Sequence, residues 1–126
     1  NMTTSQSGKL LLQSMAKSYI DSEVLAAKNA GFTSGQTWQD VKASRAANTS
    51  YQNTTSKPIK VAISVNTGND RYFQVSSNGT DWFNVGFFND NSGIGLQTSV
   101  SEIVPVNWYY RISGGVSSID YWAELR

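Results

Sequence analysis

Apolar side chains in residues 9–30 recur three or four positions apart, and this spacing places them on one face of a helix. The stripe consists of Leu12, Ala16, Tyr19, Ile20, Val24 and Ala27. Gly31 follows and can take the left-handed conformation that ends a helix. The pattern predicts one short amphipathic helix. Its apolar face needs a cover, which is either the rest of the domain or copies of the same helix in a short coiled coil.

From Thr37 onward the apolar side chains recur at every second position, a period typical of half-buried β-strands. The clearest strand runs from Pro58 to Val65, with four aliphatic side chains on one face: Ile59, Val61, Ile63 and Val65. Further strand segments are Arg71–Phe88, Leu96–Val104, Val106–Ile112 and Ile119–Leu125. Six or seven short strands separated by regular turns predict a mainly β fold, an antiparallel β-sandwich preceded by the short N-terminal α-helix.

The segment Arg71–Phe88 is interpreted as a β-hairpin. Its turn is Ser76–Gly79, with Gly79 in the left-handed position of a type I turn plus bulge. This register pairs Phe73 with Phe83. It also gathers the apolar residues of both strands on one face of the hairpin: Phe73, Val75, Phe83, Val85 and Phe87.

The composition excludes several kinds of catalytic group and metal site. The chain has no His and no Cys, which excludes imidazole bases, thiolate nucleophiles, disulfides and zinc fingers. A net charge of +1 is too small for a nucleic-acid footprint. No apolar run approaches the roughly 20 residues of a membrane-spanning helix. We therefore expect no cofactor, no metal site, no nucleic-acid partner and no membrane insertion. The nine acidic residues could still supply a pair of catalytic carboxylates, but small sandwich domains seldom carry the deep cleft that hydrolysis needs, so we expect no catalytic residues.

The segment Gln36–Val65 carries a specific motif. Its residues are Trp38, Val41, Ser44, Arg45, Ala46, Tyr51, Asn53, Thr54, Thr55, Lys57, Pro58 and Ile59. The motif resembles the C-terminal head domain of many bacteriophage tail fibres. Val100–Pro105 and the closing Trp122–Arg126 also fit that pattern, and Ala16–Ser22 is similar to a segment that often precedes fibre tips. The stretch Asn66–Leu96 lies outside the resemblance.

The resemblance implies a homotrimeric, non-enzymatic receptor-binding tip at the distal end of a virion tail fibre, assembled in the host cytoplasm. Its partner would be a bacterial lipopolysaccharide glycan or an outer-membrane protein. We expect residues 1–33 to form a helical stalk and residues 34–126 to form the β-sandwich head. Because the chain begins at Asn1, we also expect it to be part of a longer protein.

Strand alternation predicts that four large aromatic side chains face away from the core: Tyr72, Trp82, Tyr109 and Trp122. Exposed aromatics of this size indicate a binding surface, either for a receptor or for another subunit. Loops that contain Asn89, Asp90 and Asn91 add amide and carboxylate groups, which serve either turn formation or hydrogen bonds to a glycan. The receptor-binding candidates are Tyr72, Trp82, Asn89, Asp90, Asn91 and Tyr109.

The candidates for the trimer interface are Leu12, Tyr19, Ile20, Arg45 and Trp122. Arg45 is expected to be structural, paired with a carboxylate such as Asp40, Glu102 or Glu124. Two alternatives to receptor binding remain open. The head is a cap that trimerises and folds the fibre, or the chain is a monomeric carbohydrate-binding module.

Overall fold

The computed structural model describes residues 32–89 and 97–126, and residues 36–126 form one compact unit. The predicted helix over 9–30, with Leu12, Tyr19 and Ile20, lies outside the described residues, as do Asp90 and Asn91. The division into a stalk of residues 1–33 and a head therefore stays a prediction.

The described part is mainly β, as predicted from the alternating pattern, and holds eight short strands rather than six or seven. They are β1 (Trp38–Asp40), β2 (Tyr51–Gln52), β3 (Ile59–Asn66), β4 (Arg71–Ser76), β5 (Phe83–Phe88), β6 (Gln97–Val104), β7 (Tyr109–Ile112) and β8 (Ser118–Leu125). A single 3-10 turn, η1 (Lys42–Ser44), follows β1.

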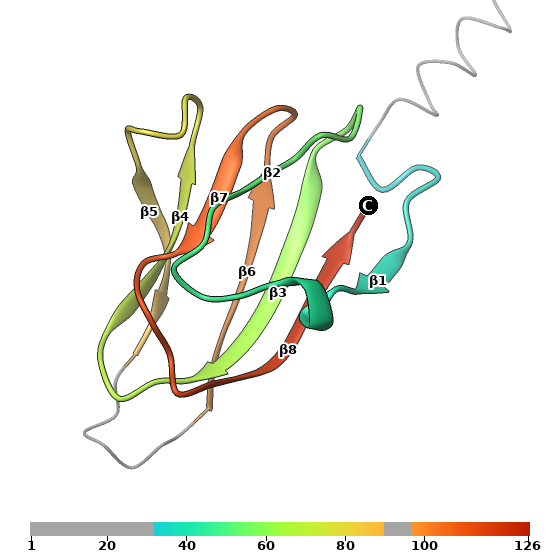
Figure 1. Ribbon diagram of the computed structural model, residues 1–126. Coiled ribbons are helices and arrows are strands. Elements are labelled where there is room, and N and C mark those ends of the chain that lie inside the picture. The colour runs from blue at the N-terminus through green and yellow to red at the C-terminus, as the bar shows by residue number, and fades with distance from the viewer. Residues whose placement is uncertain (1–31, 90–96) are drawn as a thin grey trace, which may run out of the picture. The chain divides into compact units, whose positions relative to one another are not determined.

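The strands form two antiparallel sheets of four. Sheet A has the order β1-β8-β3-β6, and sheet B has the order β2-β7-β4-β5. Figure 1 shows β5, β4 and β7 at the left and β3, β8 and β1 at the right. The long strands of sheet A pair along their whole length, from Ile59 opposite Val104 to Asn66 opposite Gln97.

The core lies between the two sheets. The four aliphatic residues of β3 that were predicted to share one face, Ile59, Val61, Ile63 and Val65, are all buried. Phe73, Val75, Tyr110 and Ile112 of sheet B are buried opposite them. Burial of such side chains contributes roughly 1.5–3 kcal/mol each. The opposite face of sheet B is therefore left for other contacts.

A buried carboxylate organises the edge of the core next to η1. Glu124 is fully buried and accepts two hydrogen bonds from Arg45, through Nε and Nη2, each at 3.1 Å. It also accepts hydrogen bonds from Tyr110 Oη at 2.8 Å, Trp122 Nε1 at 3.1 Å and Arg126 Nη1 at 3.2 Å. The prediction that Arg45 pairs with a carboxylate is confirmed, and the partner is Glu124 of the same chain.

This network shifts the pKa of two partners of Glu124, Arg45 and Tyr110, upward. Burial alone lowers the pKa of the Arg45 guanidinium, but the hydrogen bond to Glu124 and its charge outweigh that effect, so the pKa is raised. Burial raises the pKa of the Tyr110 phenol, and the neighbouring Glu124 charge raises it further. Tyr110 therefore stays protonated and Arg45 charged, which keeps the carboxylate fully paired.

A second buried polar residue fixes the connection between β2 and β3. Asn53 is fully buried, and its Nδ2 donates to the backbone carbonyls of Lys57 and Val104 at 2.8 and 3.1 Å. Its Oδ1 accepts from the backbone N–H and the hydroxyl of Thr55 at 3.1 and 2.6 Å. Arg45, Asn53 and Thr55 of the Gln36–Val65 motif thus have a structural role, because their hydrogen bonds satisfy buried polar groups.

Two β-bulges overturn parts of the predicted side-chain pattern. In β8 the pairing passes from Ser64–Tyr121 to Val65–Ile119, which leaves Asp120 as an extra residue. A bulge changes the face on which the following side chains lie. The expectation that Trp122 faces outward is therefore wrong: Trp122 is 0% exposed, whereas Tyr121 is 49% exposed. Trp122 has no surface left for a subunit contact.

The second bulge lies in the β4–β5 hairpin. The left-handed Gly79 is confirmed, with φ of 80°, but the predicted Phe73–Phe83 pairing is wrong. Phe83 lies opposite Val75, and Phe73 lies opposite Gly86, with Val85 as the extra residue. The predicted shared face is consequently split. Phe83, Val85 and Phe87 are exposed, and Phe88 takes the buried position.

Candidate functional site

The outer face of sheet B brings together three of the predicted receptor-binding residues. Because Tyr110 and Ile112 of β7 point into the core, Tyr109 and Arg111 lie on the opposite face. The same alternation in β4 places Tyr72 and Gln74 there, beside the core residues Phe73 and Val75. Trp82, in the connection between β4 and β5, contacts this face through Arg111.

A row of hydrogen-bonded side chains crosses the middle of this face. Gln74 lies opposite Arg111 on one neighbouring strand and opposite Asn84 on the other. Arg111 Nε donates to Gln74 Oε1 at 2.8 Å. Gln74 Nε2 in turn donates to Asn84 Oδ1 at 2.8 Å. The three side chains form a ladder that runs from β7 across β4 to β5.

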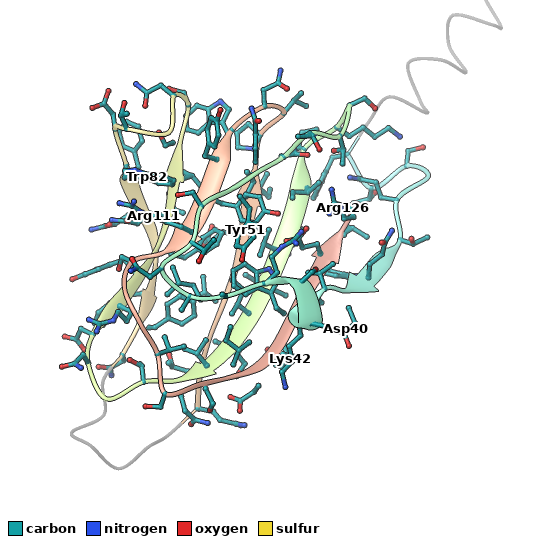
Figure 2. The ribbon with its side chains drawn as sticks, in the orientation of Figure 1. Asp40, Lys42, Tyr51, Trp82, Arg111 and Arg126 are labelled. Carbon is teal, nitrogen blue, oxygen red and sulfur yellow. The ribbon has the colours of Figure 1, made fainter. Side chains whose placement is uncertain are left out.

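Trp82 covers one side of the Arg111 guanidinium. The guanidinium carbon of Arg111 lies 3.9 Å from the centre of the Trp82 ring, a close cation–π contact. Figure 2 shows the two side chains next to each other at the left of the sandwich. Arg111 is thus fixed by two contacts, the ring of Trp82 and the hydrogen bond to Gln74. Trp82 is therefore half-buried rather than fully exposed, and it positions Arg111 as well as offering its own ring.

The lower end of the face is aromatic. The rings of Tyr72 and Phe87 lie 5.3 Å apart in a tilted arrangement, and they are 38% and 47% exposed. Together with Asn84, Val85 and Gly86 they line an open hollow of about 300 Å³. An exposed aromatic ring beside an amide is a common arrangement for sugar binding, because the ring packs on C–H groups while the amide bonds hydroxyls.

The upper end of the face is a loop organised by Asn78. Asn78 Oδ1 accepts hydrogen bonds from the backbone N–H groups of Thr80 and Asp81 at 2.9 and 2.8 Å, and Asn78 Nδ2 donates to Asp81 Oδ2 at 2.8 Å. The left-handed Gly79 lies against Tyr109, whose ring would be 3.7 Å from a methyl group added at Gly79. Tyr109 is thus half-buried, with its ring packed under the loop.

The other predicted receptor residues do not join this face. Asn89 is exposed directly after β5, and its backbone N–H donates to Thr98 Oγ1 at 3.3 Å. Asp90 and Asn91 lie outside the described residues. Trp122 belongs to the core, as described above. Sequence reasoning missed Arg111, Gln74 and Asn84. The only signal in the sequence is that strand alternation places two amides and one Arg at outward positions. That their three strands are neighbours follows from the fold.

No cluster of three or more acidic, His or Cys side chains that could hold a metal occurs in residues 32–89 and 97–126. In the same described ranges, no helix has the length and apolar character needed to cross a membrane.

No family model matches the chain, and no curated protein or solved structure matches it either. The resemblance to tail-fibre heads therefore rests on the motif residues alone.

Proposed function

We propose that this chain is the receptor-binding tip of a phage tail fibre, which adheres to a bacterial cell surface without catalysis. The observation that carries the proposal is the outer face of sheet B. It gathers Tyr72, Trp82 and Tyr109 with an Arg–Gln–Asn ladder on one side of a rigid sandwich. The motif in Gln36–Val65 supports the assignment to tail fibres. We place the protein at the distal end of the fibre, after assembly in the host cytoplasm.

The proposed mechanism is reversible adhesion to a lipopolysaccharide glycan. The exposed rings of Tyr72 and Phe87 would pack on the apolar side of a sugar. The side chain of Asn84 would bond the hydroxyl groups. The hollow beside these residues is open and shallow, so one copy would bind weakly. Three copies on one fibre would raise the effective affinity by avidity. An outer-membrane protein is the second target class for the same face.

The outer face of sheet A favours a second role, contact between subunits. Its exposed large side chains are Trp38, Ile103 and Tyr121. The registers place Leu125 and Lys60 between Trp38 and Ile103, and the neighbouring row consists of small residues, with Ala62 opposite both Ala123 and Ser101. A flat face with small side chains in the middle suits close packing against another copy of the chain. We propose this face as the head's trimer contact, and a cap that only trimerises the fibre would use the same surface.

Two tyrosine variants separate these roles. Tyr72 is 38% exposed on sheet B, and Tyr121 is 49% exposed on sheet A, so Tyr72→Ala and Tyr121→Ala are matched changes. Co-sedimentation with a panel of Gram-negative strains measures cell binding, and analytical ultracentrifugation measures mass. We expect Tyr72→Ala to lose cell binding at unchanged mass. We expect Tyr121→Ala to lower the mass.

Three results would count against the proposal. A wild-type chain that sediments with none of the strains contradicts receptor binding. A folded Tyr72→Ala variant that binds cells as well as the wild type removes the outer face of sheet B as the site. A Tyr121→Ala variant of unchanged mass removes sheet A as the subunit contact.

A further inference from the structure

In the ladder on the outer face of sheet B, the side-chain chemistry determines which group donates each hydrogen bond and which accepts it. Arg111 can only donate hydrogen bonds, so Gln74 must turn its oxygen toward Arg111 and its nitrogen toward Asn84. Asn84 must then turn its oxygen toward Gln74. The observed bonds follow this order, at 2.8 Å each. Each side-chain oxygen of the ladder thus already accepts one hydrogen bond, and N–H donors of Arg111, Gln74 and Asn84 remain available for a ligand.

Arg111 also forms no salt bridge with a carboxylate of the described residues. Arg45 and Arg126 both pair with Glu124, at 3.1 and 3.2 Å. For Arg111 the described residues contain no acidic group within salt-bridge distance, and its Nη1 and Nη2 atoms make no hydrogen bond there. Asp81 of the neighbouring loop instead accepts a hydrogen bond from Asn78. The centre of the face is thus positively charged and rich in donors.

The stacking on Trp82 decides how a ligand would approach. The indole lies against the guanidinium, with 3.9 Å between the guanidinium carbon and the ring centre, so a ligand would reach Arg111 from a side that the indole does not cover. Tyr72 lies two residues from Gln74 on the same face of β4, roughly 7 Å along the strand. An anion at the Arg111 edge and a sugar ring on Tyr72 are therefore compatible with one small ligand.

We propose that this face selects acidic sugars. Arg111 would bind the carboxylate or phosphate of the sugar by charge-assisted hydrogen bonds, Asn84 Nδ2 would donate a further bond, and Tyr72 would pack on the ring. This inference rests on the proposed function, because it names the ligand class of the same receptor face. It requires a donor-rich, charge-unbalanced centre, which a neutral glycan would not need.

Calorimetric titration of the full chain tests this inference with three probes. The probes are a trimer of galacturonic acid, the same trimer reduced to neutral galactose, and glucose 6-phosphate. We expect an acidic probe to bind more tightly than the neutral trimer and to lose affinity at high salt. A higher affinity for galacturonate identifies a carboxylate ligand, and a higher affinity for glucose 6-phosphate identifies a phosphate ligand.

The variants Arg111→Gln and Lys42→Gln each remove one positive charge. Lys42 is exposed in η1, which contacts β8 of sheet A, and Figure 2 shows it at the opposite side of the sandwich from Arg111. We expect Arg111→Gln to lower the affinity for the acidic probes at least about tenfold, which is the scale of one hydrogen bond to a charged group. The affinities of Lys42→Gln for all three probes should not change.

Asn84→Asp provides a second variant that keeps the size of the side chain and the acceptor for Gln74. It replaces a free donor with a negative charge on an exposed strand residue, so the chain should fold, and binding of the acidic probes should disappear. It keeps the inference testable if Arg111→Gln fails to fold.

Equal affinity of the wild type for acidic and neutral probes would overturn the inference. So would unchanged binding of the acidic probes by both variants, or failure of the wild type to bind either acidic probe. If the wild type still sediments with bacterial cells in any of these cases, receptor binding survives and only the ligand class is wrong. If it also fails to bind cells, the proposed function fails with it.

Discussion

Glu124 shows at the scale of one residue how a small domain tolerates a buried charge. Four side chains donate to its carboxylate: Arg45, Tyr110, Trp122 and Arg126. The charge and the hydrogen-bonding capacity of the carboxylate are thus met by Arg45, far away in sequence, and by three residues of the C-terminal strands and terminus. A buried ion is stable only when it is paired in this way. The contribution of Arg45 to the motif of residues 36–65 is explained by this contact.

Replacement of the carboxylate tests that account. Glu124→Gln leaves the partly buried guanidinium of Arg45 without its counter-charge and turns an amide N–H toward other donors. We expect a loss of about 3–5 kcal/mol in the free energy of unfolding, the range for breaking a buried pair. Urea denaturation measures it. Glu102→Gln, at a half-exposed position of β6, is the matched control and should change stability by less than about 0.5 kcal/mol. Equal effects would refute the special role of Glu124.

Tyr110 predicts how stability responds to alkali. Its pKa is raised in the folded chain by burial and by Glu124, while in the unfolded chain it ionises near its ordinary value of about 10. Unfolding above that pH therefore releases a proton, so this contribution to stability is complete below about pH 10 and declines as the pH rises further. Tyr110→Phe should show a shallower decline in urea denaturation between about pH 9 and pH 11. Parallel curves for the two proteins would contradict the network.

At the scale of elements, the hairpin β4–β5 determines the geometry of the candidate site. Its bulge turns Phe87 toward Tyr72 and turns Gly86 toward β6 of the other sheet. A side chain at Gly86 would overlap Val100 and press on the Cβ of Phe73. A glycine is therefore required where the two sheets approach each other at β5 and β6.

Gly86→Ala tests this close approach. The added methyl must displace Val100, and overpacking of this kind destabilises by about 1–3 kcal/mol. Gly115 offers a matched control, since a methyl added there meets nothing within 4 Å. Thermal unfolding compares the two variants. A Gly86→Ala chain as stable as Gly115→Ala would show that the sheets can separate there without loss.

Single strands could be predicted from the sequence, whereas bulges and strand neighbours could not. Strand β3 could be predicted because strict alternation of Ile59, Val61, Ile63 and Val65 has one interpretation, a strand with one buried face. The two bulges could not be predicted, because one extra residue in a strand leaves no mark in local composition. For this reason strict alternation predicts Trp122 on the outside and Phe87 on the inside, whereas Trp122 is buried and Phe87 is exposed. The Arg111 ladder was missed for a related reason: it depends on which strands are neighbours, and that is set by the whole fold.

At the scale of the molecule, the two outer faces of the sandwich differ in chemistry. Sheet B carries rings, amides and Arg111, whereas sheet A carries a row of small residues around Ala62 beside the large side chains of Trp38, Ile103 and Tyr121. A fibre tip needs both kinds of surface, one for the receptor and one for its own copies. Their separation on opposite sheets would let the head trimerise without covering its receptor site.

The mass in solution tests the assembly. The chain weighs 13.8 kDa, and the account predicts a particle of three times that mass by sedimentation equilibrium. A monomer at every protein concentration would contradict the subunit role of sheet A and would favour a monomeric carbohydrate-binding module. Tyr121→Ala in the same instrument locates the contact.

The most direct test of the receptor face is amide NMR of the isotopically labelled chain during titration with oligosaccharide released from the lipopolysaccharide of a strain that the chain binds. If the outer face of sheet B is the receptor site, we expect chemical-shift changes confined to the neighbourhood of five residues: Tyr72, Gln74, Trp82, Asn84 and Arg111. Changes centred on the outer face of sheet A, or none at saturating oligosaccharide, would contradict the assignment of sheet B as the receptor-binding surface.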